Sequence, residues 1–480
     1  MKKTVSIAVA LVLVLGAVWL GSSWWFSRQV ESRYRQLVAR AAHLSGAEIA
    51  VESYQRGWRN ATARIRVVVP APPASHGHKL PALSFTVIND IVSGPFPGGA
   101  AGWRPAMALV HSRVALGSNL LKELRKELPA FPEVLPVQST AVIYLGGNGE
   151  SWTNAVPVHK TLAKPEPVTI DWQGLKGHST FTTDFKECKG ELQMPSLEVN
   201  AKTGRLKLAG CGATYDLHLP QGLEGLMLGD FAYKLKSLEF ASESAKGGRK
   251  TTFTLQNLAV KGSNWETEGV VDGVLRTSFE RLNINGVDNG PGVWDMQVTN
   301  LDAAALREMQ QLSRHLRADR RLSPQQRQAQ FMAGLGKLWP RFAARSPGVE
   351  IRDLSFKGSD GHLHCRGKIA IDGSNKAFLA SPLLLPKVVT AQASIDISAR
   401  MLRKIVGVMV SQRLVTARSA SGQPPLPEEQ LNAMVDATAA QVVASLTKKH
   451  VLIRQGDVYT LSFDYDSGKA KLNGQSIPLN

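Results

Sequence analysis

Short runs in which apolar and polar residues alternate dominate the chain between residues 47 and 300. Turn residues, chiefly Gly, Asn and Asp, separate these runs. A period of two is typical of strands that bury one face, and the scarcity of helical segments between the runs argues against a βαβ arrangement. The pattern therefore predicts an α+β fold that is mostly antiparallel β, with a large curved sheet over residues 47–300. Ser118–Leu128 is the one helix expected inside this region.

Apolar residues at helical spacing appear in a second region, residues 301–480. Asp302 is expected to cap the first helix there and Pro324 to begin the next, which Pro340 should disturb. One β-hairpin is expected over 349–373 and another at the C-terminal end. Between the hairpins, two apolar stripes predict a C-terminal helix pair: Leu402, Ile405, Val406, Met409 and Val410 in the first helix, and Leu431, Met434, Val435, Val442 and Leu446 in the second. This region is thus expected to mix flanking helices with hairpins.

An uncharged apolar run, Thr4–Phe26, follows two lysines at the N-terminus. At about 1.5 Å per residue in a helix, this run is long enough to cross about 30 Å of hydrocarbon. A cleaved signal peptide is the competing interpretation, because Gly21 and Ser23 are small enough to flank a cleavage site. The aromatic residues that end the run favour an uncleaved anchor. We expect residues 1–3 in the cytoplasm, the anchor in a bacterial inner membrane and the bulk of the chain in the periplasm.

Residues 27–46 follow the expected anchor and have an amphipathic helical pattern. The apolar residues that fall on one side of this helix are Val30, Tyr34, Leu37, Val38 and Ala41. The arginines of the segment fall elsewhere on the helix. We therefore expect an amphipathic stalk helix over 27–46, between the membrane and the sheet.

The turn "YQRGW", Tyr54–Trp58, interrupts the first strand pattern of the sheet. Gly57 is expected to supply the turn of a hairpin, with Arg64 and Arg66 pointing to the polar face of its second strand. Trp58 is expected to cover the start of the sheet where the stalk helix enters. The candidate structural residues are thus Tyr54, Arg56, Gly57 and Trp58.

The chain has a formal net charge of +18 and a pI near 9.9. Such an excess fits nucleic acid, anionic lipid headgroups or cell-wall polymers, or only a solvated surface. The expected periplasmic location argues against nucleic acid, and the sequence has no Walker-type loop, zinc-finger spacing or RRM-like block. The expected partners are therefore the inner membrane, through residues 4–26, and a lipid or an envelope protein. Self-association into a homo-oligomer stays open.

Three cysteines and a histidine pair are the candidate reactive groups. Cys188 and Cys211 lie in strand-like segments close in sequence, so an oxidising compartment would allow a disulfide that stabilises by about 2–4 kcal/mol. Cys365 would then be a buried free thiol. His362 and His364 share one face of an expected strand, the spacing that lets two imidazoles reach one metal ion. Ordinary surface histidines are the competing interpretation, and no cofactor is expected.

The chain resembles the YdgA-like family of bacterial envelope proteins of unknown function over essentially its full length. The features that carry the resemblance are the anchor with its Arg-rich helix, the "YQRGW" turn, "NLDAAAL" at 300–306, "SPGVEIRDLSFKGSDGHLHCRG" at 346–367 and the terminal "DSGKAKLNGQSIPL". Two loops depart from the family pattern, at Arg59 and Asn60, and at Ser93. The resemblance implies a membrane-anchored envelope protein and supplies no reaction and no catalytic residues.

No nucleophile elbow, zinc-protease motif or dinucleotide fingerprint is present. We therefore expect a non-enzymatic protein with no catalytic residues, whose β-rich surface binds a lipid-like or other envelope ligand. The strands with apolar faces and the few helices to cover them are the reason for this hypothesis. An assembly or scaffold protein that binds other proteins is the alternative, and a hydrolase without a recognisable motif is a third hypothesis.

Overall fold

The computed structural model describes residues 22–478 apart from 23, 43–46, 70–82, 128–130, 163–166, 224, 244–250, 320, 376–381 and 421–425. The chain divides into two compact units. Unit 1 comprises Met1–Tyr233 and Ala241–Gly248, and unit 2 comprises Lys234–Phe240 and Arg249–Asn480. Strand β12 (Leu228–Ser242) contributes residues to both units.

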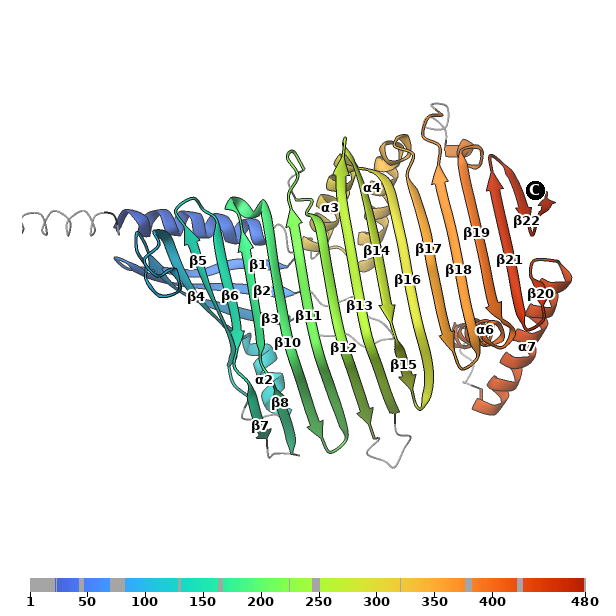
Figure 1. Cartoon of the computed structure of the whole chain (residues 1–480), viewed down its shortest axis with the longest axis horizontal. Coiled ribbons are helices and arrows are strands. Elements are labelled where there is room, and N and C mark those ends of the chain that lie inside the picture. Colours follow the sequence, from blue (N-terminus) through green and yellow to red (C-terminus); the bar gives the residue numbers. More distant parts are fainter. Residues whose placement is uncertain are drawn as a thin grey trace, which may run out of the picture. The chain divides into compact units, whose positions relative to one another are not determined.

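Unit 1 is built on an antiparallel sheet with the hydrogen-bonded order β1–β2–β3–β4–β5–β6–β9–β10–β11 (Figure 1). These strands are β1 (Glu48–Arg56), β2 (Asn60–Val69), β3 (Leu83–Ser93), β4 (Ala106–Leu116), β5 (Val134–Tyr144), β6 (Gly149–Ala155), β9 (Leu175–Phe181), β10 (Glu187–Ala201) and β11 (Gly204–His218). The short strands β7 (Val158–Leu162) and β8 (Val168–Trp172) pair with each other, and β8 also pairs with β10. Helix α2 (Ser118–Glu127) joins β4 to β5, where the sequence predicts a helix.

The helix over residues 24–42 packs on one face of the unit 1 sheet. Its buried residues Val30, Tyr34 and Val38 lie against small and branched residues of β2, β3 and β4. Ala63 and Ala108 are fully buried beneath it, and their small side chains let the helix come close to the strands. The predicted apolar side of this helix is therefore confirmed. The helix is part of the unit 1 core.

Unit 2 contains a second antiparallel arrangement, with the order β13–β14–β16–β17–β18–β19–β21–β22–β23. These strands are β13 (Thr251–Thr267), β14 (Val270–Phe279), β16 (Val287–Asp302), β17 (Gly348–Gly358), β18 (Gly361–Ile371), β19 (Val389–Ser398), β21 (Val458–Asp466), β22 (Lys469–Leu472) and β23 (Gln475–Ile477). The short strand β15 (Arg281–Ile284) fits between β13 and β16 next to the end of β14, and β20 (Ile453–Gln455) pairs with β21. Both hairpins predicted for residues 301–480 are confirmed.

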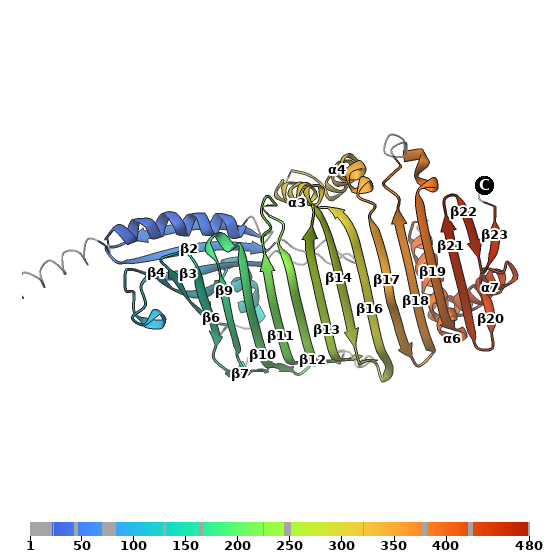
Figure 2. The ribbon, with the colours of Figure 1, turned by 45° about the horizontal axis from the view of Figure 1, so that its top comes forward.

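Two helical hairpins belong to unit 2, one of α3 (Ala303–Ala318) and α4 (Pro324–Ala344), the other of α6 (Ala399–Ala420) and α7 (Glu428–Lys448). The Asp302 carboxylate accepts a hydrogen bond from the Ala305 amide, so the predicted cap of α3 is confirmed. Helix α4 begins at Pro324 as predicted, but it continues past Pro340 to Ala344. Figure 2 shows α3 and α4 near one end of the strands of unit 2 and α6 and α7 near the other.

The predicted fold class is confirmed in its main feature, since the described chain is mostly antiparallel sheet with a few helices. The predicted anchor, residues 4–26, lies outside the described residues apart from its last few positions. Among the helices that the structure does describe, none is both long and apolar enough to span a bilayer.

Candidate ligand-binding surface

The sheet of unit 2 has one apolar and one polar face, as two neighbouring rows of paired residues show. The row on the apolar face consists of Met296, Ile351, Gly367, Ala393 and Phe463. The next row, on the polar face, consists of Gln297, Glu350, Lys368, Gln392 and Asp464. Successive side chains of a strand point to opposite faces, so the alternation in the sequence separates the two surfaces.

Both helical hairpins pack on the apolar face. Residues Leu402 and Val406 of α6 join a core cluster with Leu363, Ile395 and Leu461 of the strands. The α3–α4 hairpin packs on β16 through a cluster that contains Leu301. Each hairpin covers only part of the face, because these clusters gather near the strand ends.

Large apolar side chains between the two clusters stay exposed to solvent. They are Leu275, Trp294, Val349 and Ile369, with Trp294 exposed by 52 % and Ile369 by 49 %. All four share the apolar face by register. Leu275 pairs with Met296, Trp294 with Leu354 and Ile369 with Val349. Isolated exposed apolar residues are normal, but several on one sheet face form the kind of patch that marks a binding site.

A hollow of about 880 Å³ lies along the α6–α7 hairpin. Its lining is mostly apolar: Val406, Met409, Val410, Ala417, Val442 and Leu446, with Gln412, Arg413 and Thr416 as the polar members. Val406 and Leu446 also belong to the cluster packed on the sheet. The hollow therefore adjoins the apolar face of unit 2 and has Arg413 as its one charged lining residue.

The side of α6 that packs on the sheet continues uncovered beyond the packed turn. Leu402 contacts the sheet cluster, while Ile405 and Met409 follow it by three and seven residues and so lie on the same side of the helix. Met409 is nevertheless exposed by 55 %. An apolar helix side and an apolar sheet face are thus both left open in unit 2.

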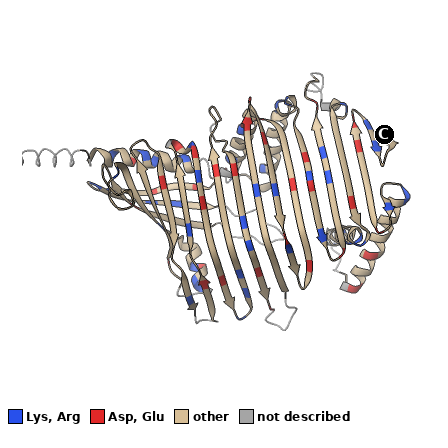
Figure 3. Ribbon diagram, viewed as in Figure 1, with Lys and Arg blue, Asp and Glu red and all other residues tan. Residues whose placement is uncertain are grey.

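Figure 3 marks basic and acidic residues in the middle of the unit 2 strands. Cross-strand ion pairs join some of these residues on the polar face. Asp295 of β16 is held by Arg276 on one side, at 3.1 Å, and by Arg352 on the other, at 2.7 Å. His364 lies 3.7 Å from Asp353. This face is therefore a solvated surface in which cross-strand charge pairs support the sheet.

The sequence of the chain matches a known protein family and is similar to two known proteins. The sequence model of the family described as "Bacterial protein of unknown function (DUF945)" matches residues 1–480. The chain belongs to this family. It is 20 % identical to Protein YdgA of Escherichia coli (strain K12), over 98 % of this chain and 94 % of that protein. It is 22 % identical to an uncharacterized protein of Haemophilus influenzae, over 64 % of this chain and 85 % of that protein. No solved structure matches.

The "YQRGW" turn of this DUF945 chain meets the helix over 24–42 at three of its residues. Ser27 Oγ donates a hydrogen bond to the Gly57 carbonyl at 3.2 Å, Arg56 lies 3.7 Å from Glu31, and the Tyr54 ring contacts the Tyr34 ring at a tilted angle. Gly57 forms the predicted turn, where an added Cβ would lie 2.8 Å from the Asn60 carbonyl oxygen.

Trp58 does not have the predicted covering role, because it is exposed by 56 %. Tyr34 and Tyr54 close this junction instead. Burial raises the pKa of Tyr54 to about 12, with Glu31 adding to the rise. Burial also raises the pKa of Tyr34 well above its ordinary value. Both phenols therefore stay protonated in the folded DUF945 chain at any physiological pH.

The predicted disulfide between Cys188 and Cys211 is wrong for this fold. The two residues lie on adjacent strands, but Cys188 pairs with Leu217 whereas Cys211 pairs with Met194. This offset along the strands is about 20 Å at the usual rise per residue, far beyond the Cα separation that a disulfide allows. All three thiols are free, and burial raises the pKa of each.

The histidine pair does share a strand face, as predicted, but its two members have different partners. The His362 ring contacts the Ser398 hydroxyl at 3.0 Å, while His364 faces Asp353. Within the described part of the chain, no three His, Cys, Asp or Glu side chains come close enough together to hold a metal ion. The arrangement favours surface histidines over a metal site.

Sequence reasoning missed the open surface of α6. The stripe from Leu402 to Val410 has the spacing of a core-facing helix, and the pattern does not tell a covered stripe from an open one. The one available signal was the excess of apolar residues around α6, where Val408 and Val415 lie outside the predicted stripe and are also exposed.

Proposed function

We propose that this chain is a non-enzymatic envelope protein whose unit 2 binds a lipid-like molecule on its apolar surface. The hollow of about 880 Å³ along α6 and α7 carries the proposal, because it is lined mainly by apolar side chains and adjoins an uncovered sheet face. Its volume lies in the range of small-molecule sites, about 300–1,000 Å³. The apolar patch around Trp294 and Ile369 extends the surface available to an acyl chain.

The polar members of the hollow suggest how such a ligand would be oriented. Arg413 provides a permanent positive charge and Gln412 an amide beside it, both from the same helix as Met409. A few polar groups in an apolar lining are what fixes the direction of an amphipathic ligand. The ligand class is therefore an amphiphile with an anionic head near Arg413 and its apolar part along Met409, Val410 and Leu446.

The location of this surface is part of the proposal. With residues 4–26 as an anchor in a bacterial inner membrane, unit 2 would stand in the periplasm. A periplasmic protein next to a bilayer has amphiphilic molecules within reach. The basic balance of the chain, +18, favours contact with anionic lipids in that setting.

The test uses the full chain purified in a nonionic maltoside detergent and titrated with pyrene-labelled phosphatidylglycerol. Met409→Glu is expected to weaken binding at least about tenfold, because a carboxylate would have to enter the apolar hollow. Met332→Glu is the matched control, since Met332 of α4 is exposed by 57 % against 55 % for Met409 and lies outside the hollow. Arg413→Gln is expected to reduce the preference for phosphatidylglycerol over phosphatidylcholine.

Equal binding by the two glutamate variants would overturn the proposal. So would native mass spectrometry that repeatedly finds the extracted protein free of lipid. A photo-crosslinker at position 409 in intact cells separates the alternatives. Crosslinks to lipid support the proposal, whereas crosslinks to one defined envelope protein and none to lipid favour an assembly or scaffold protein.

A further inference from the structure

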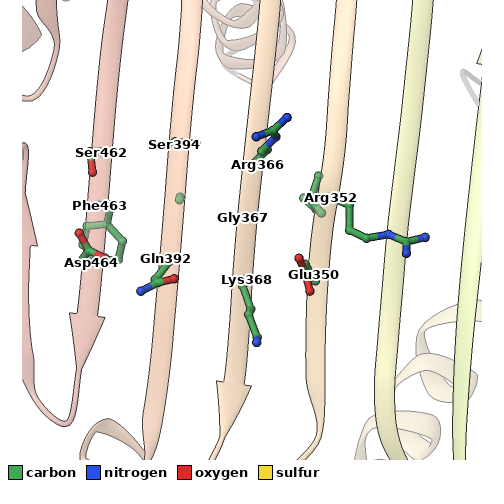
Figure 4. A pocket seen from close by; sticks show the side chains of 12 residues that line it. Glu350, Arg352, Arg366, Gly367, Lys368, Gln392, Ser394, Ser462, Phe463 and Asp464 are labelled. Atoms are coloured by element: carbon green, nitrogen blue, oxygen red, sulfur yellow. The ribbon is translucent and has the colours of Figure 1, made fainter.

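A shallow depression of about 350 Å³ lies on the polar face of unit 2, across β17, β18, β19 and β21. Its lining consists of one stretch from each strand: 350–352, 366–368, 392–394 and 462–464. Gly367 and Ala393 lie in the middle row, whose side chains belong to the apolar face, so backbone forms the floor. The walls are the polar side chains of the two flanking rows (Figure 4).

Four charged side chains around this depression have no ionic partner among the residues that the structure describes. Arg366 and Lys368 come from β18, Glu350 from β17 and Asp464 from β21. Among the described residues, no carboxylate lies within ion-pair distance of either cation, and no cation within that distance of either acid. Elsewhere on the same face Asp295 is paired with Arg276 and Arg352. Arg352 belongs to that paired set, and Figure 4 shows its side chain directed away from the depression.

The donors of the depression are grouped around its floor. Arg366 pairs across the strands with Ser394, and Lys368 pairs with Gln392. Residues two apart on a strand lie about 7 Å apart and neighbouring strands about 4.8 Å apart, so these four side chains mark the corners of a small rectangle. Figure 4 shows Arg366 and Lys368 extending in opposite directions from Gly367, which leaves the middle uncovered. A guanidinium, an ammonium, a hydroxyl and an amide are together suited to an oxyanion.

The acids are placed just outside these donors. Glu350 pairs across the strands with Lys368, and Asp464 pairs with Gln392 on one side and with Lys471 on the other. A simple anion would meet two repelling carboxylates within a few ångströms of its site. A ligand that also carries a positive group would turn one of these carboxylates into a partner.

We propose that the depression binds a compact zwitterion in which an oxyanion and a primary ammonium are close neighbours. The oxyanion lies over Gly367, where the Arg366 and Lys368 side chains have to turn inward from the directions drawn in Figure 4. Ser394 is a further donor, and the ammonium lies at Glu350 or Asp464. This site is on the opposite face of the sheet from the proposed lipid surface and does not depend on it.

The experiment is ligand-observed NMR on the full chain in maltoside detergent, with O-phosphoethanolamine and β-alanine as separate zwitterionic probes. These two arms distinguish a phosphate from a carboxylate as the oxyanion. Binding of at least one probe is expected, with a dissociation constant of about 1 mM for such an exposed site. Arg366→Gln and Lys368→Gln should each weaken it at least about fivefold, and Glu350→Gln with Asp464→Asn should remove the advantage over inorganic phosphate or acetate.

Two controls keep the result specific to the depression. Lys357→Gln removes a cation from the same face of β17 but outside the depression, and it should leave binding unchanged. Met409→Glu changes the proposed lipid surface and should also leave zwitterion binding unchanged. Failure of the lipid proposal and failure of the zwitterion proposal can therefore be told apart. Absence of binding by both probes overturns the inference. Equal binding of the simple anions, or binding that survives both β18 variants, overturns it as well.

Discussion

Arg352 donates two hydrogen bonds to one oxygen of Asp295, from Nη2 at 2.7 Å and from Nε at 3.0 Å. A β-bulge makes this contact possible. Asp295 pairs with Asp353 and Met296 with Ile351, so Arg352 is the extra residue of β17. Arg276 donates to the other carboxylate oxygen at 3.1 Å. Asp295 thus ties β14, β16 and β17 together on the polar face.

We expect Asp295→Ala to lower the free energy of unfolding by about 1–2 kcal/mol, because two arginines lose a shared, nearly buried partner. Urea denaturation of the purified full chain measures the change. Asp288→Ala is the control, since Asp288 forms an exposed pair with Arg281 and its loss should cost less than about 0.5 kcal/mol. Equal effects of the two variants would contradict the role given to Asp295.

Two glycines of α4 should respond differently to alanine. An added Cβ at Gly336 meets nothing within 4 Å, whereas at Gly334 it would lie 2.1 Å from Leu312 Cδ2 of α3. Gly336→Ala should stabilise by about 0.5–1 kcal/mol through helix propensity. Gly334→Ala should lose part or all of that gain, because the Leu312 side chain has to move away from the new methyl group. Thermal unfolding measures both variants, and equal stabilisation would contradict a close contact between position 334 and Leu312.

Replacing Tyr34 or Tyr54 with Phe should change the free energy of unfolding differently at the two positions. Tyr34 Oη accepts a hydrogen bond from Asn89 Nδ2 at 2.6 Å in the unit 1 core. Tyr34→Phe should therefore cost about 1–2 kcal/mol, since it leaves that buried donor unsatisfied. Tyr54 Oη is buried and has no hydrogen-bond partner among the described residues, so Tyr54→Phe should be neutral or stabilising by up to about 1 kcal/mol. Chemical denaturation at neutral pH measures both, and a larger loss from Tyr54→Phe would refute this assignment.

Alkaline pH should weaken unit 1 through the same two phenols. The pKa of Tyr54 is raised to about 12 and that of Tyr34 is raised further, both mainly by burial. An unfolded tyrosine ionises near pH 10, so the unfolded state releases its protons first as the pH rises. The stability from the buried phenols is thus complete below about pH 10 and falls as the pH rises toward 12.

Stability measured at intervals between pH 9 and 12 tests this expectation. Each phenol contributes a slope of at most about 1.4 kcal/mol per pH unit. Tyr54→Phe should make the decline shallower, while Tyr233→Phe, at an exposed tyrosine, should leave it unchanged. An identical decline in all three proteins would mean that other groups cause it.

Thiol counting tests the corrected cysteine assignment. The chain has three cysteines, and all three are free in the structure. Alkylation of the denatured, unreduced protein should therefore modify three thiols, as should alkylation after reduction. Protein exported to the periplasm is the proper sample, because a disulfide could form there. Modification of a single thiol without reduction would mean that two of the three cysteines are bonded. If peptide mapping then identifies Cys188 and Cys211 as the pair, the β10–β11 register differs from the one described.

Part of this fold follows from local patterns in the sequence. The alternation of apolar and polar residues predicted the antiparallel strands. Asp302 and Pro324 predicted the starts of α3 and α4. Both predictions succeed because periodicity and helix capping act within a few residues. Arg64 and Arg66 point away from the helix-covered face, as their positions on the strand require. The sequence likewise placed the apolar side of the helix over 24–42, though not the sheet that it covers.

By itself, therefore, the sequence determined the main strands and helix starts, the two faces of the strands and the membership of the family. Only the tertiary structure decided which apolar side chains stay uncovered, such as Trp294 and Met409, and that Trp58 is exposed. It also decided that Cys188 and Cys211 are far apart, and that no carboxylate of the described residues lies within ion-pair distance of Arg366 or Lys368. The physical reason is that period and capping are local, whereas burial, register and ion pairing depend on residues distant in the chain.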